Sequence, residues 1–600
     1  MANNAKYDLY GQGSVLGHPS GLFVLFFTEM WERFSYYGMR ALLVLFLTAS
    51  MTGDNPGWEW SKEMALSLLG TYAMLVYLTP IVGGYLADQK LGYRNAVVIG
   101  ALLMTLGHAS MALETPTFLY IGIALLIVGN GFFKPNMTSI ISKMYTGHED
   151  KKDGAFTIFY MGVNAGAFLG IMLCGYVGER IGWSWGFGLA GIFMFLGMIQ
   201  FYLAQPLFGN IGAKPSERDA VQLGSDNILD DGDQSVEEEE EPAEIAKRNP
   251  FLTIDYILIG IFVVSALIYI INDPLSTIGG IETLNFTIAG LSDSYFFAVL
   301  AGATFLLLLV LRIPRYSLIV RDRMVAVVIF SILTVFFWAA FEQAAGTLPL
   351  YTRDFTQRVL TGSGATIFKI VDFSVTVIPL LIITYVLFRL FKQTFSRISV
   401  SNIVLGTSFL IIWGIVIFKI YSESQVSESE VPVTWFAILN SLFIIVFAPL
   451  FSRLWESKYN PPGAIKYAMG MILLGVGFAF LAFGARNVPA GAETAQLSMF
   501  WLIMAYLFHT LGELCLSPMG LSYLSKLVPP RMIAFMFGVY YLAIAIGNKI
   551  AHSFGGNIDA IAKEDGLSYF FWILTFIPIG LGILSAILTP LLKKLMHGVR

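Results

Sequence analysis

Residues 29–40 read Glu-Met-Trp-Glu-Arg-Phe-Ser-Tyr-Tyr-Gly-Met-Arg, and they lie inside the first long apolar stretch of the chain. Four of these side chains are charged, namely Glu29, Glu32, Arg33 and Arg40. On insertion scales, an unpaired charge at the centre of a bilayer costs roughly 2.5–3.5 kcal/mol. Together with Tyr36, the four residues follow a helical period and share one face of a helix. We predict that this face is turned toward protein or a water-filled cavity, either as a structural ion-pair cluster or as part of a polar pathway.

The overall composition is that of a membrane protein. Of the 600 residues, 56% are hydrophobic and 13% are charged, whereas about 25% of the residues of a soluble domain are charged. The mean hydropathy is +0.69. The formal net charge is −4 without a strongly basic segment, which excludes nucleic acid as a partner. Residues 1–20 lack the apolar core of a secretory signal, so we expect the first membrane helix to direct insertion.

Enzyme and metal chemistry are not expected from this chain. Its two cysteines, Cys174 and Cys515, lie in apolar segments and form neither a disulfide framework nor a metal-ligand spacing. The sequence contains no recognisable nucleophile–base set and no phosphate-binding loop. We therefore expect a protein without a metal or cofactor that is not an enzyme.

Apolar runs long enough to cross a membrane recur along the whole chain. An apolar helix of about 20 residues spans a bilayer, and the chain contains about sixteen such runs. They are 21–48, 62–86, 94–113, 117–134, 155–178, 185–205, 251–272, 294–313, 324–349, 366–388, 401–421, 434–454, 463–485, 496–520, 531–553 and 569–593. The stretch between the sixth and seventh runs includes the acidic run 237–241, and its composition is typical of a disordered linker.

The distribution of Lys and Arg between the loops predicts the orientation of the spans. If the N-terminus is cytoplasmic, basic residues concentrate in the inner loops, whereas the predicted outer loops 273–293 and 422–433 contain none. The inner basic residues are Lys90, Arg94, Lys143, Lys151, Lys152, Lys247, Arg248, Arg312, Arg315, Arg321, Arg323, Arg389, Lys392, Arg397, Arg453, Lys458, Lys526, Arg531, Lys593, Lys594 and Arg600. This is the positive-inside pattern, and it predicts that both termini are cytoplasmic.

The acidic stretch divides the spans into two sets. This division predicts an all-α polytopic membrane protein with two six-helix bundles and four accessory transmembrane helices, and with a site between the halves near the membrane midplane. The predicted domains are an N-terminal six-helix bundle at 1–205, an acidic cytoplasmic linker at 206–250, an accessory helix pair at 251–313, a seventh core helix at 314–350, an inserted helical hairpin at 351–430 and the remaining C-terminal bundle helices at 431–600.

A loop after the second span supports this architecture. Residues 83–94 read Gly-Gly-Tyr-Leu-Ala-Asp-Gln-Lys-Leu-Gly-Tyr-Arg, which resembles the G-G-x-x-A-D-x-x-x-G-x-[RK] loop of the major facilitator superfamily. The glycines allow close helix approach and a tight turn, and Asp88 can cap a helix end or pair with Arg94. We expect this loop to have a structural and conformational role rather than to contact substrate.

Five further motifs are similar to those of the proton-dependent oligopeptide transporter (POT/PTR) family, and they follow the family's order over nearly the whole chain. They are Glu-x-x-Glu-Arg-Phe-x-Tyr-Tyr-Gly at 29–38, Gly-Asn-Gly-Phe-Phe-Lys-Pro-Asn at 129–136, Phe-Tyr-x-x-x-Asn-x-Gly at 159–166, Phe-Trp-x-x-x-Glu-Gln at 337–343 and Glu-Leu-x-x-Ser-Pro at 513–518. The resemblance implies a proton-coupled symporter of di- and tripeptides that works by alternating access.

The resemblance also implies a peptide-binding site. Arg40 and Lys134 would receive the carboxyl terminus of the peptide, and Glu513 would receive its amino terminus. The other pocket positions are Tyr36, Tyr37, Tyr77, Asn164, Asn440, Ser517 and Tyr540. Tyr540 stands where the family often has tryptophan, which leaves the shape of the side-chain pocket open. For Tyr77 and Tyr540, ordinary helix packing is the alternative.

The resemblance assigns proton coupling to charged residues of the first and seventh core helices. These residues are Glu29, Glu32, Arg33 and Glu342. A carboxylate paired with Arg or Lys has a lowered pKa, and an unpaired one in a low dielectric has a raised pKa. Protonation of one of these carboxylates would therefore release its partner and favour a conformational change. The family's outer gate corresponds to Arg40 and Glu342. Its inner gate corresponds to Lys134 and Glu513.

Three of the polar residues also allow a structural interpretation. Lys134 lies near the end of a predicted span and could extend to the interface, although the neighbouring glycines and Pro135 favour a broken helix. Glu342 could be a buried pair-former. His509, one turn before Glu513, is predicted to be packed and hydrogen-bonded, with proton transfer as the alternative.

The chain departs from the family pattern between the seventh and eighth core helices. The family's eighth-helix pattern appears at 440–449, far more than one loop after Glu342. We infer an inserted helical hairpin, in which Lys369 and Asp372 are three residues apart and can pair. We expect it to serve as a peripheral scaffold or an oligomer contact, with a regulatory or partner-binding role as the alternative.

The expected partners are di- and tripeptides, protons and the lipid bilayer, and the oligomeric state is not predicted. Two other functions remain as alternatives, which are transport of another small solute such as an amino acid or nitrate, and a non-transporting nutrient sensor. The accessory pair at 251–313 matches extra helices of many bacterial members, which favours an integral protein of a bacterial inner membrane.

Overall fold

Long helices make up most of this structure, a computed structural model that describes residues 12–215, 249–281, 284, 286–288, 291–529 and 532–598. The acidic run 237–241 lies outside the described residues, and so does the side chain of Ser517. The described residues form two compact units. Unit 1 comprises those within Met1–Glu59, Leu75–Asp230 and Tyr351–Leu442, and unit 2 comprises those within Trp60–Met74, Asp231–Leu350 and Phe443–Arg600. The domain boundaries proposed from the sequence stay a prediction.

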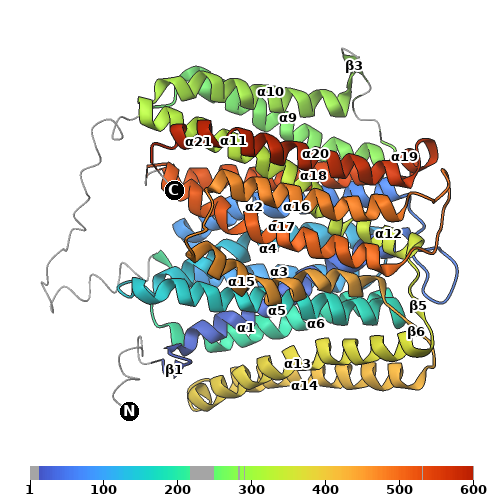
Figure 1. Ribbon diagram of the computed structural model, residues 1–600. Helices are drawn as coiled ribbons and strands as arrows, with labels where there is room; N and C mark the ends of the chain where they lie inside the picture. Colours follow the sequence, from blue (N-terminus) through green and yellow to red (C-terminus); the bar gives the residue numbers. More distant parts are fainter. Residues whose placement is uncertain are drawn as a thin grey trace, which may run out of the picture. The chain divides into compact units, whose positions relative to one another are not determined.

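Unit 1 contains the first group of helices and the inserted hairpin. Its elements are β1 (Ser14–Val15), β2 (His18–Pro19), α1 (Ser20–Thr48), η3 (Ala87–Leu91), α3 (Tyr93–Met111), α4 (Pro116–Met144), α5 (Glu149–Arg180), α6 (Trp183–Ala204), η4 (Gln205–Phe208), β5 (Val359–Leu360), α13 (Gly362–Thr394), α14 (Ser399–Gln425), β6 (Ser429–Glu430) and η7 (Val433–Ala437). The strand pairs β1–β2 and β5–β6 are antiparallel. The two hairpin helices α13 and α14 lie side by side (Figure 1).

Unit 2 contains the accessory pair and the C-terminal helices. Its elements are α9 (Thr253–Thr277), β3 (Thr287–Ile288), β4 (Leu291–Ser292), α10 (Asp293–Arg312), η5 (Ile313–Arg315), α11 (Leu318–Phe341), η6 (Glu342–Ala345), α16 (Gly463–Gly484), α17 (Met499–Leu527), α18 (Ile533–Gly556), α19 (Ile558–Glu564), α20 (Leu567–Ile587) and α21 (Thr589–Leu595). The boundary between the units falls within three further helices, α2 (Lys62–Leu86), α12 (Thr347–Phe355) and α15 (Ile438–Glu456).

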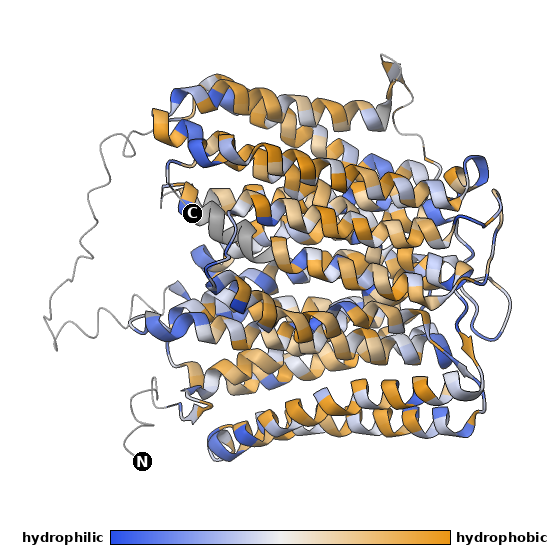
Figure 2. Ribbon diagram, in the orientation of Figure 1, coloured by the Kyte–Doolittle hydropathy of each residue, from blue (hydrophilic) through white to orange (hydrophobic). Residues whose placement is uncertain are grey.

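Hydrophobic residues make up most of each helix, and hydrophilic residues gather at helix ends and in loops (Figure 2). Each predicted span falls on a helix, which confirms an all-α membrane protein. Among the described residues, 13 helices are long and apolar enough to cross a membrane, so the count of about sixteen spans is not confirmed. Three predicted spans, which fall on α1, α3 and α18, are not among the 13. Of these, α1 carries four charged residues, and charge lowers the apolarity of a span.

Helix α4 differs from its prediction at the C-terminal end. The sequence predicts a span that ends at Lys134, but α4 continues to Met144 and stays helical through Pro135. The expected break in the helix is therefore wrong, and Lys134 lies inside the helix rather than near its end. A proline inside a membrane helix is tolerated where neighbouring groups satisfy the freed backbone. The backbone group freed here is the Gly131 carbonyl, four residues before the proline, whereas the hydroxyl groups of Thr138 and Ser139 both donate to the Pro135 carbonyl.

Helix α5 packs on α1 through glycines spaced four residues apart. A methyl group added at Gly166 would lie 2.2 Å from the carbonyl oxygen of Met30, and one at Gly170 would lie 2.2 Å from that of Phe34. These distances are below van der Waals contact, so only glycine allows the two backbones to approach this closely. Small residues at every fourth position are typical of helix interfaces in membranes. The approach holds the charged segment of α1 against α5.

A buried ion pair joins the two helices of the inserted hairpin. The Lys419 ammonium of α14 lies 2.6 Å from both carboxylate oxygens of Asp372 on α13, and the two side chains are 3% and 7% exposed. The Trp435 indole donates to the same carboxylate at 3.1 Å. The predicted pair of Lys369 and Asp372 is wrong, because Lys419 approaches from the facing helix. Lys369 instead donates to the Val426 carbonyl.

The hairpin is also anchored on the rest of unit 1. The Ser401 hydroxyl of α14 donates to the Gln200 carbonyl of α6 at 2.7 Å. The Phe409 ring meets Phe27 and Trp31 of α1 edge-on, at centroid distances of 5.7 Å and 5.6 Å. The hairpin therefore belongs structurally with the N-terminal helices, and its expected role as a scaffold or oligomer contact stays a prediction.

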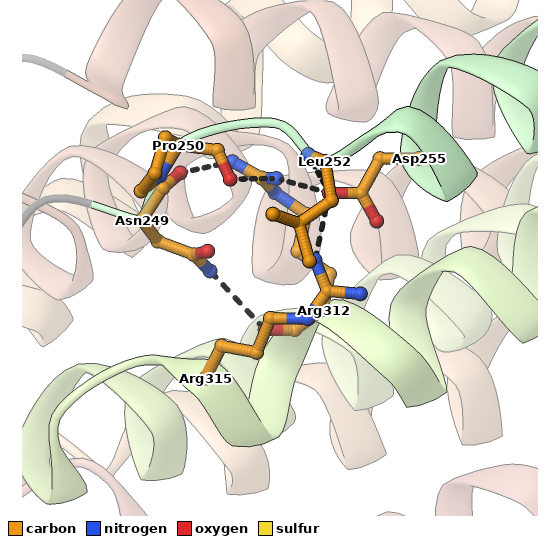
Figure 3. A network of polar contacts seen from close by, with 6 residues as sticks. All are labelled: Asn249, Pro250, Leu252, Asp255, Arg312 and Arg315. Atoms are coloured by element: carbon orange, nitrogen blue, oxygen red, sulfur yellow. Dashed lines mark hydrogen bonds and ion pairs between the residues drawn. The ribbon is translucent and has the colours of Figure 1, made fainter.

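A second charged network closes one end of the accessory pair in unit 2 (Figure 3). The fully buried Asp255 carboxylate of α9 accepts hydrogen bonds from Arg312 at 3.0 Å and from Arg315 at 2.8 Å. It also accepts from the Leu252 backbone N–H at 2.9 Å, which caps the helix. Arg312 donates further to the Asn249 carbonyl at 2.7 Å. These bonds fasten the start of α9 to the end of α10.

We expect Gly166→Ala to destabilise the protein, because the added methyl group collides with the Met30 carbonyl and pushes α5 away from α1. Overpacking of this kind costs roughly 1–3 kcal/mol. Thermal unfolding in detergent measures the effect. The matched control is Gly260→Ala on α9, where no atom lies within 4 Å of the added carbon. Equal melting temperatures for the two variants would contradict the packing argument.

We expect Asp372→Asn to destabilise unit 1 strongly, because it leaves the buried Lys419 without its counter-charge. Breaking one partner of a buried pair costs about 3–5 kcal/mol, whereas replacing both partners by uncharged groups is often neutral. The double variant Asp372→Asn/Lys419→Met should therefore recover most of the melting temperature in the same assay. A double variant as unstable as the single one would show that the ion pair is not the cause.

Candidate functional site

The charged face of α1 forms a buried cluster in unit 1. The Arg33 Nε atom lies 2.8 Å from a carboxylate oxygen of Glu29 and 2.8 Å from one of Glu32. The Glu32 side chain is fully buried and that of Arg33 is 7% exposed. A guanidinium shared by two carboxylates lowers the cost of burying all three groups. The sequence placed these residues on one helical face, and their ion pairs agree with that placement.

Helix α4 contributes an amide and an ammonium to this cluster. The Asn130 side chain donates to Glu32 Oε1 at 3.1 Å. One turn later, the Lys134 ammonium lies 4.5 Å from the centre of the Tyr77 ring of α2, a cation–π geometry. Lys134 also interacts electrostatically with Glu32. Sequence reasoning missed Asn130, although it lies in the 129–136 motif one helical turn before Lys134.

Aromatic and basic side chains continue the same face of α1. The Arg33 guanidinium lies 5.6 Å from the centre of the Tyr36 ring. The Tyr36 and Tyr37 rings meet edge-on, with centroids 5.0 Å apart and an interplanar angle of 88°. Arg40, one turn after Tyr36, is buried. The structure therefore brings four of the predicted α1 site residues into one continuous polar and aromatic strip.

Two further predicted site residues of unit 1 lie on α5 and α15. Asn164 on α5 is half-buried, and its amide donates to the Tyr160 carbonyl of its own helix at 2.9 Å. Within the described part of the chain, it makes no hydrogen bond to Glu29, Glu32 or Arg33. Asn440 lies near the start of α15 and is half-buried. Their assignment to a peptide pocket stays a prediction.

The predicted site residues of unit 2 come from three helices. Glu342 is 5% exposed and begins η6, directly after α11. Its neighbour Gln343 donates to the Ala551 carbonyl of α18 at 2.8 Å, which holds this turn in place. Glu513 on α17 is half-buried, and Tyr540 on α18 is buried. Each proposed gate pair takes one residue from each unit, and both pairs stay predictions.

His509 is packed as predicted, but its predicted hydrogen bond is wrong. The imidazole is 1% exposed and its centroid lies 4.3 Å from that of the Phe478 ring. Neither ring nitrogen has a hydrogen-bond partner among the described residues. The imidazole lies against Gly477 and Phe478 of α16, and neither of these residues has a polar side chain.

Unit 2 contains a buried ion pair that sequence reasoning missed. The Lys549 ammonium of α18 lies 2.5 Å from a carboxylate oxygen of Asp273 on α9 and donates to the Thr71 hydroxyl at 3.0 Å. The Ser67 hydroxyl donates to the same Asp273 oxygen at 2.7 Å. A single lysine within the apolar span 531–553 was the available signal, since a charge there needs a partner.

The charged groups of the cluster on α1 and α4 balance one another. Its two carboxylates, Glu29 and Glu32, balance its two cations, Arg33 and Lys134, so the formal charge is zero. Adding one proton to Glu32 leaves an excess positive charge and weakens its hold on Arg33. That state favours an incoming carboxylate. Among the described residues, no group of three His, Cys, Asp or Glu side chains could hold a metal ion.

The chain resembles known transporters along most of its length. A family model described as "PTR2: POT family" matches residues 94–222 and 406–564. The peptide transporter YePEPT of Yersinia enterocolitica is 28% identical over 600 residues, which cover 98% of this chain and 98% of the relative. A di-/tripeptide transporter of Lactococcus lactis subsp. cremoris is 27% identical over 591 residues, covering 97% of this chain and 98% of the relative. A crystal structure of a POT family transporter in complex with a thioalcohol conjugated peptide matches with a TM-score of 0.68 and 25% identity, covering 98% of this chain and 99% of that chain.

Proposed function

Because this chain belongs to the POT family, we propose that it is a proton-coupled symporter of di- and tripeptides that works by alternating access. The observation that carries the proposal is the buried cluster of Glu29, Glu32, Arg33 and Lys134 inside membrane helices. Here one guanidinium serves two carboxylates, and a change in the protonation of either one redistributes the contacts.

Glu32 is the best-placed proton acceptor of the cluster. Its carboxylate is fully buried, contacts Arg33 and accepts a hydrogen bond from Asn130. In a low dielectric, the charged form of such a group depends on these partners. Protonation releases Arg33 toward Glu29, and a change in one buried contact can bias a conformational equilibrium. Glu342, which is buried at the end of α11, is the second proposed coupling residue.

A short peptide has a negatively charged carboxylate at one end and a positively charged amino group at the other, so its site needs groups of both charges. We assign Arg40 and Lys134 to the peptide carboxylate and Glu513 to its amino group. The remaining pocket residues are proposed to be Tyr36, Tyr37, Tyr77, Asn164, Asn440, Ser517 and Tyr540. The partial burial of Lys134 against the Tyr77 ring supports its role, because cation–π contact orients an ammonium without neutralising it.

Two residue pairs are proposed to open and close the site on either side of the membrane. Arg40 and Glu342 would close the outer side, and Lys134 and Glu513 the inner side. The positive-inside distribution of Lys and Arg supports cytoplasmic termini, and the accessory helices support a bacterial inner membrane.

Uptake of a labelled dialanine peptide into proteoliposomes tests the function. We expect uptake that rises with an inward proton gradient and that unlabelled di- and tripeptides block, whereas free alanine does not. Uptake blocked by alanine would indicate a different small solute. Absence of any uptake, from protein shown to be folded and inserted, would overturn transport and favour a nutrient sensor.

Glu32→Gln should abolish gradient-driven uptake and spare peptide counterflow, because the amide keeps the shape of the side chain but cannot exchange a proton. The same proteoliposomes report both activities. Glu564→Gln, at an exposed position in α19, is the matched control and should behave like the unchanged protein. Loss of both activities in folded Glu32→Gln protein would assign Glu32 to binding or structure instead.

A further inference from the structure

A polar pocket lies in unit 1, beside the C-terminal end of α1. It has a volume of about 210 Å³, and its walls include Leu45 and Ala49 of α1 and the side chains of Arg180, Arg353 and Arg358. Twelve residues of helix separate Arg33 from Leu45, which corresponds to roughly 18 Å. The pocket is therefore distinct from the proposed proton-coupling cluster. The positive-inside pattern predicts that this end of unit 1 is on the outer side.

Two arginines in this pocket share a single carboxylate. Arg180 Nη1 lies 3.0 Å from one carboxylate oxygen of Glu430, and Arg358 Nη1 lies 3.0 Å from the other. The Arg180 Nη2 group also donates to the Glu430 carbonyl at 2.6 Å, and Arg358 donates to the Val431 carbonyl at 2.8 Å. These bonds hold both guanidinium groups in place. Glu430 thus serves two guanidinium groups at once, and neither has this carboxylate to itself.

The guanidinium groups retain donors for a ligand. Within the described part of the chain, Arg358 donates hydrogen bonds only through Nη1, and Arg180 does not donate through Nε. The third arginine, Arg353, is oriented by the Thr48 hydroxyl at 2.7 Å and by Asp354 at 2.7 Å. Arginine presents its N–H groups in a planar fork that matches a carboxylate.

The other acidic group of the pocket, Glu179, interacts electrostatically with Arg358, but its hydrogen bonds go to the backbone and to a threonine. Glu179 accepts hydrogen bonds from the backbone N–H groups of Val433 and Thr434 at 2.8 Å and 2.9 Å, and from the Thr434 hydroxyl at 2.7 Å. These bonds commit its carboxylate to the start of η7. The Trp183 indole forms an apolar wall, and its N–H donates to the Asn55 carbonyl at 3.2 Å, which fixes its orientation.

The size of the pocket and its three guanidinium groups define the class of ligand. Pockets for drug-sized ligands measure about 300–1,000 Å³, so this smaller pocket suits a small group. We propose that it captures the terminal carboxylate of a short peptide on the outer side of the membrane, before the peptide enters the transport pathway. This inference rests on the proposed peptide transport. The bound carboxylate replaces Glu430 as partner of Arg358, so Glu430 acts as an internal competitor.

The competition between ligand and Glu430 gives two variants with opposite effects. Arg358→Gln removes a donor and should raise the KM for dialanine uptake about tenfold, with kcat unchanged, since a hydrogen bond to a charged group contributes this much. Glu430→Gln removes the competing charge and should lower the KM. The control is Arg486→Gln, which removes a positive charge from another predicted outer loop and should leave the KM unchanged.

A merely structural role for the arginines predicts a different outcome. Both Arg358→Gln and Glu430→Gln would then lower the melting temperature and raise the KM together, and that result would overturn the proposal. An unchanged KM in both variants would overturn it as well.

Binding of N-acetylalanine to the detergent-solubilised protein, measured by calorimetry, separates this proposal from the proposed transport. We expect the unchanged protein to bind this carboxylate and not N-acetylalanine amide, with weaker binding in Arg358→Gln and tighter binding in Glu430→Gln. That pattern would support the pocket even if dialanine uptake failed. Binding that is insensitive to both substitutions would exclude the pocket even if uptake succeeded.

Discussion

The burial of charge inside membrane helices is the constraint on which the rest of this structure depends. Arg33 lies between Glu29 and Glu32 at 2.8 Å from each, in a helix whose other residues are mostly apolar. Such a cluster is tolerated only where other protein surrounds it, and the close approach of α5 at Gly166 and Gly170 provides that surrounding. The functional cluster and the packing of the N-terminal helices therefore have a common cause.

The same constraint organises regions far from the candidate site. Lys419 of the inserted hairpin pairs with Asp372, and Lys549 pairs with Asp273 of the accessory helix α9. In each case, the partner comes from a different helix, so a buried pair also fixes which helices lie together. Buried pairs contribute little net stability, but loss of one partner is costly, and this makes them effective in specifying helix arrangement.

The pairs differ in how freely their charges can change. The Lys419 ammonium contacts both carboxylate oxygens of Asp372, and this arrangement is suited to holding two helices in a fixed position. In the α1 cluster, Arg33 is divided between two carboxylates, and Asn130 completes the environment of Glu32. Shared partners lower the cost of moving from one arrangement to another, which is what proton-coupled conformational change requires. In the pocket around Arg180 and Arg358, both guanidinium groups contact the single carboxylate of Glu430.

The amino-acid sequence by itself determined the all-helical membrane class, the helical face shared by Glu29, Glu32 and Arg33, and the two apolar helices at 366–388 and 401–421, because these follow from local hydrophobicity and a 3.6-residue period. Tertiary structure alone decided which partner each buried charge takes. Lys369 was the nearest basic residue to Asp372 in the sequence, yet Lys419 from the facing helix binds it. His509 lost its expected hydrogen bond for the same reason, since it faces Phe478 and Gly477. Periodicity specifies which side of a helix a residue occupies, but only the packing of other helices specifies what that side meets.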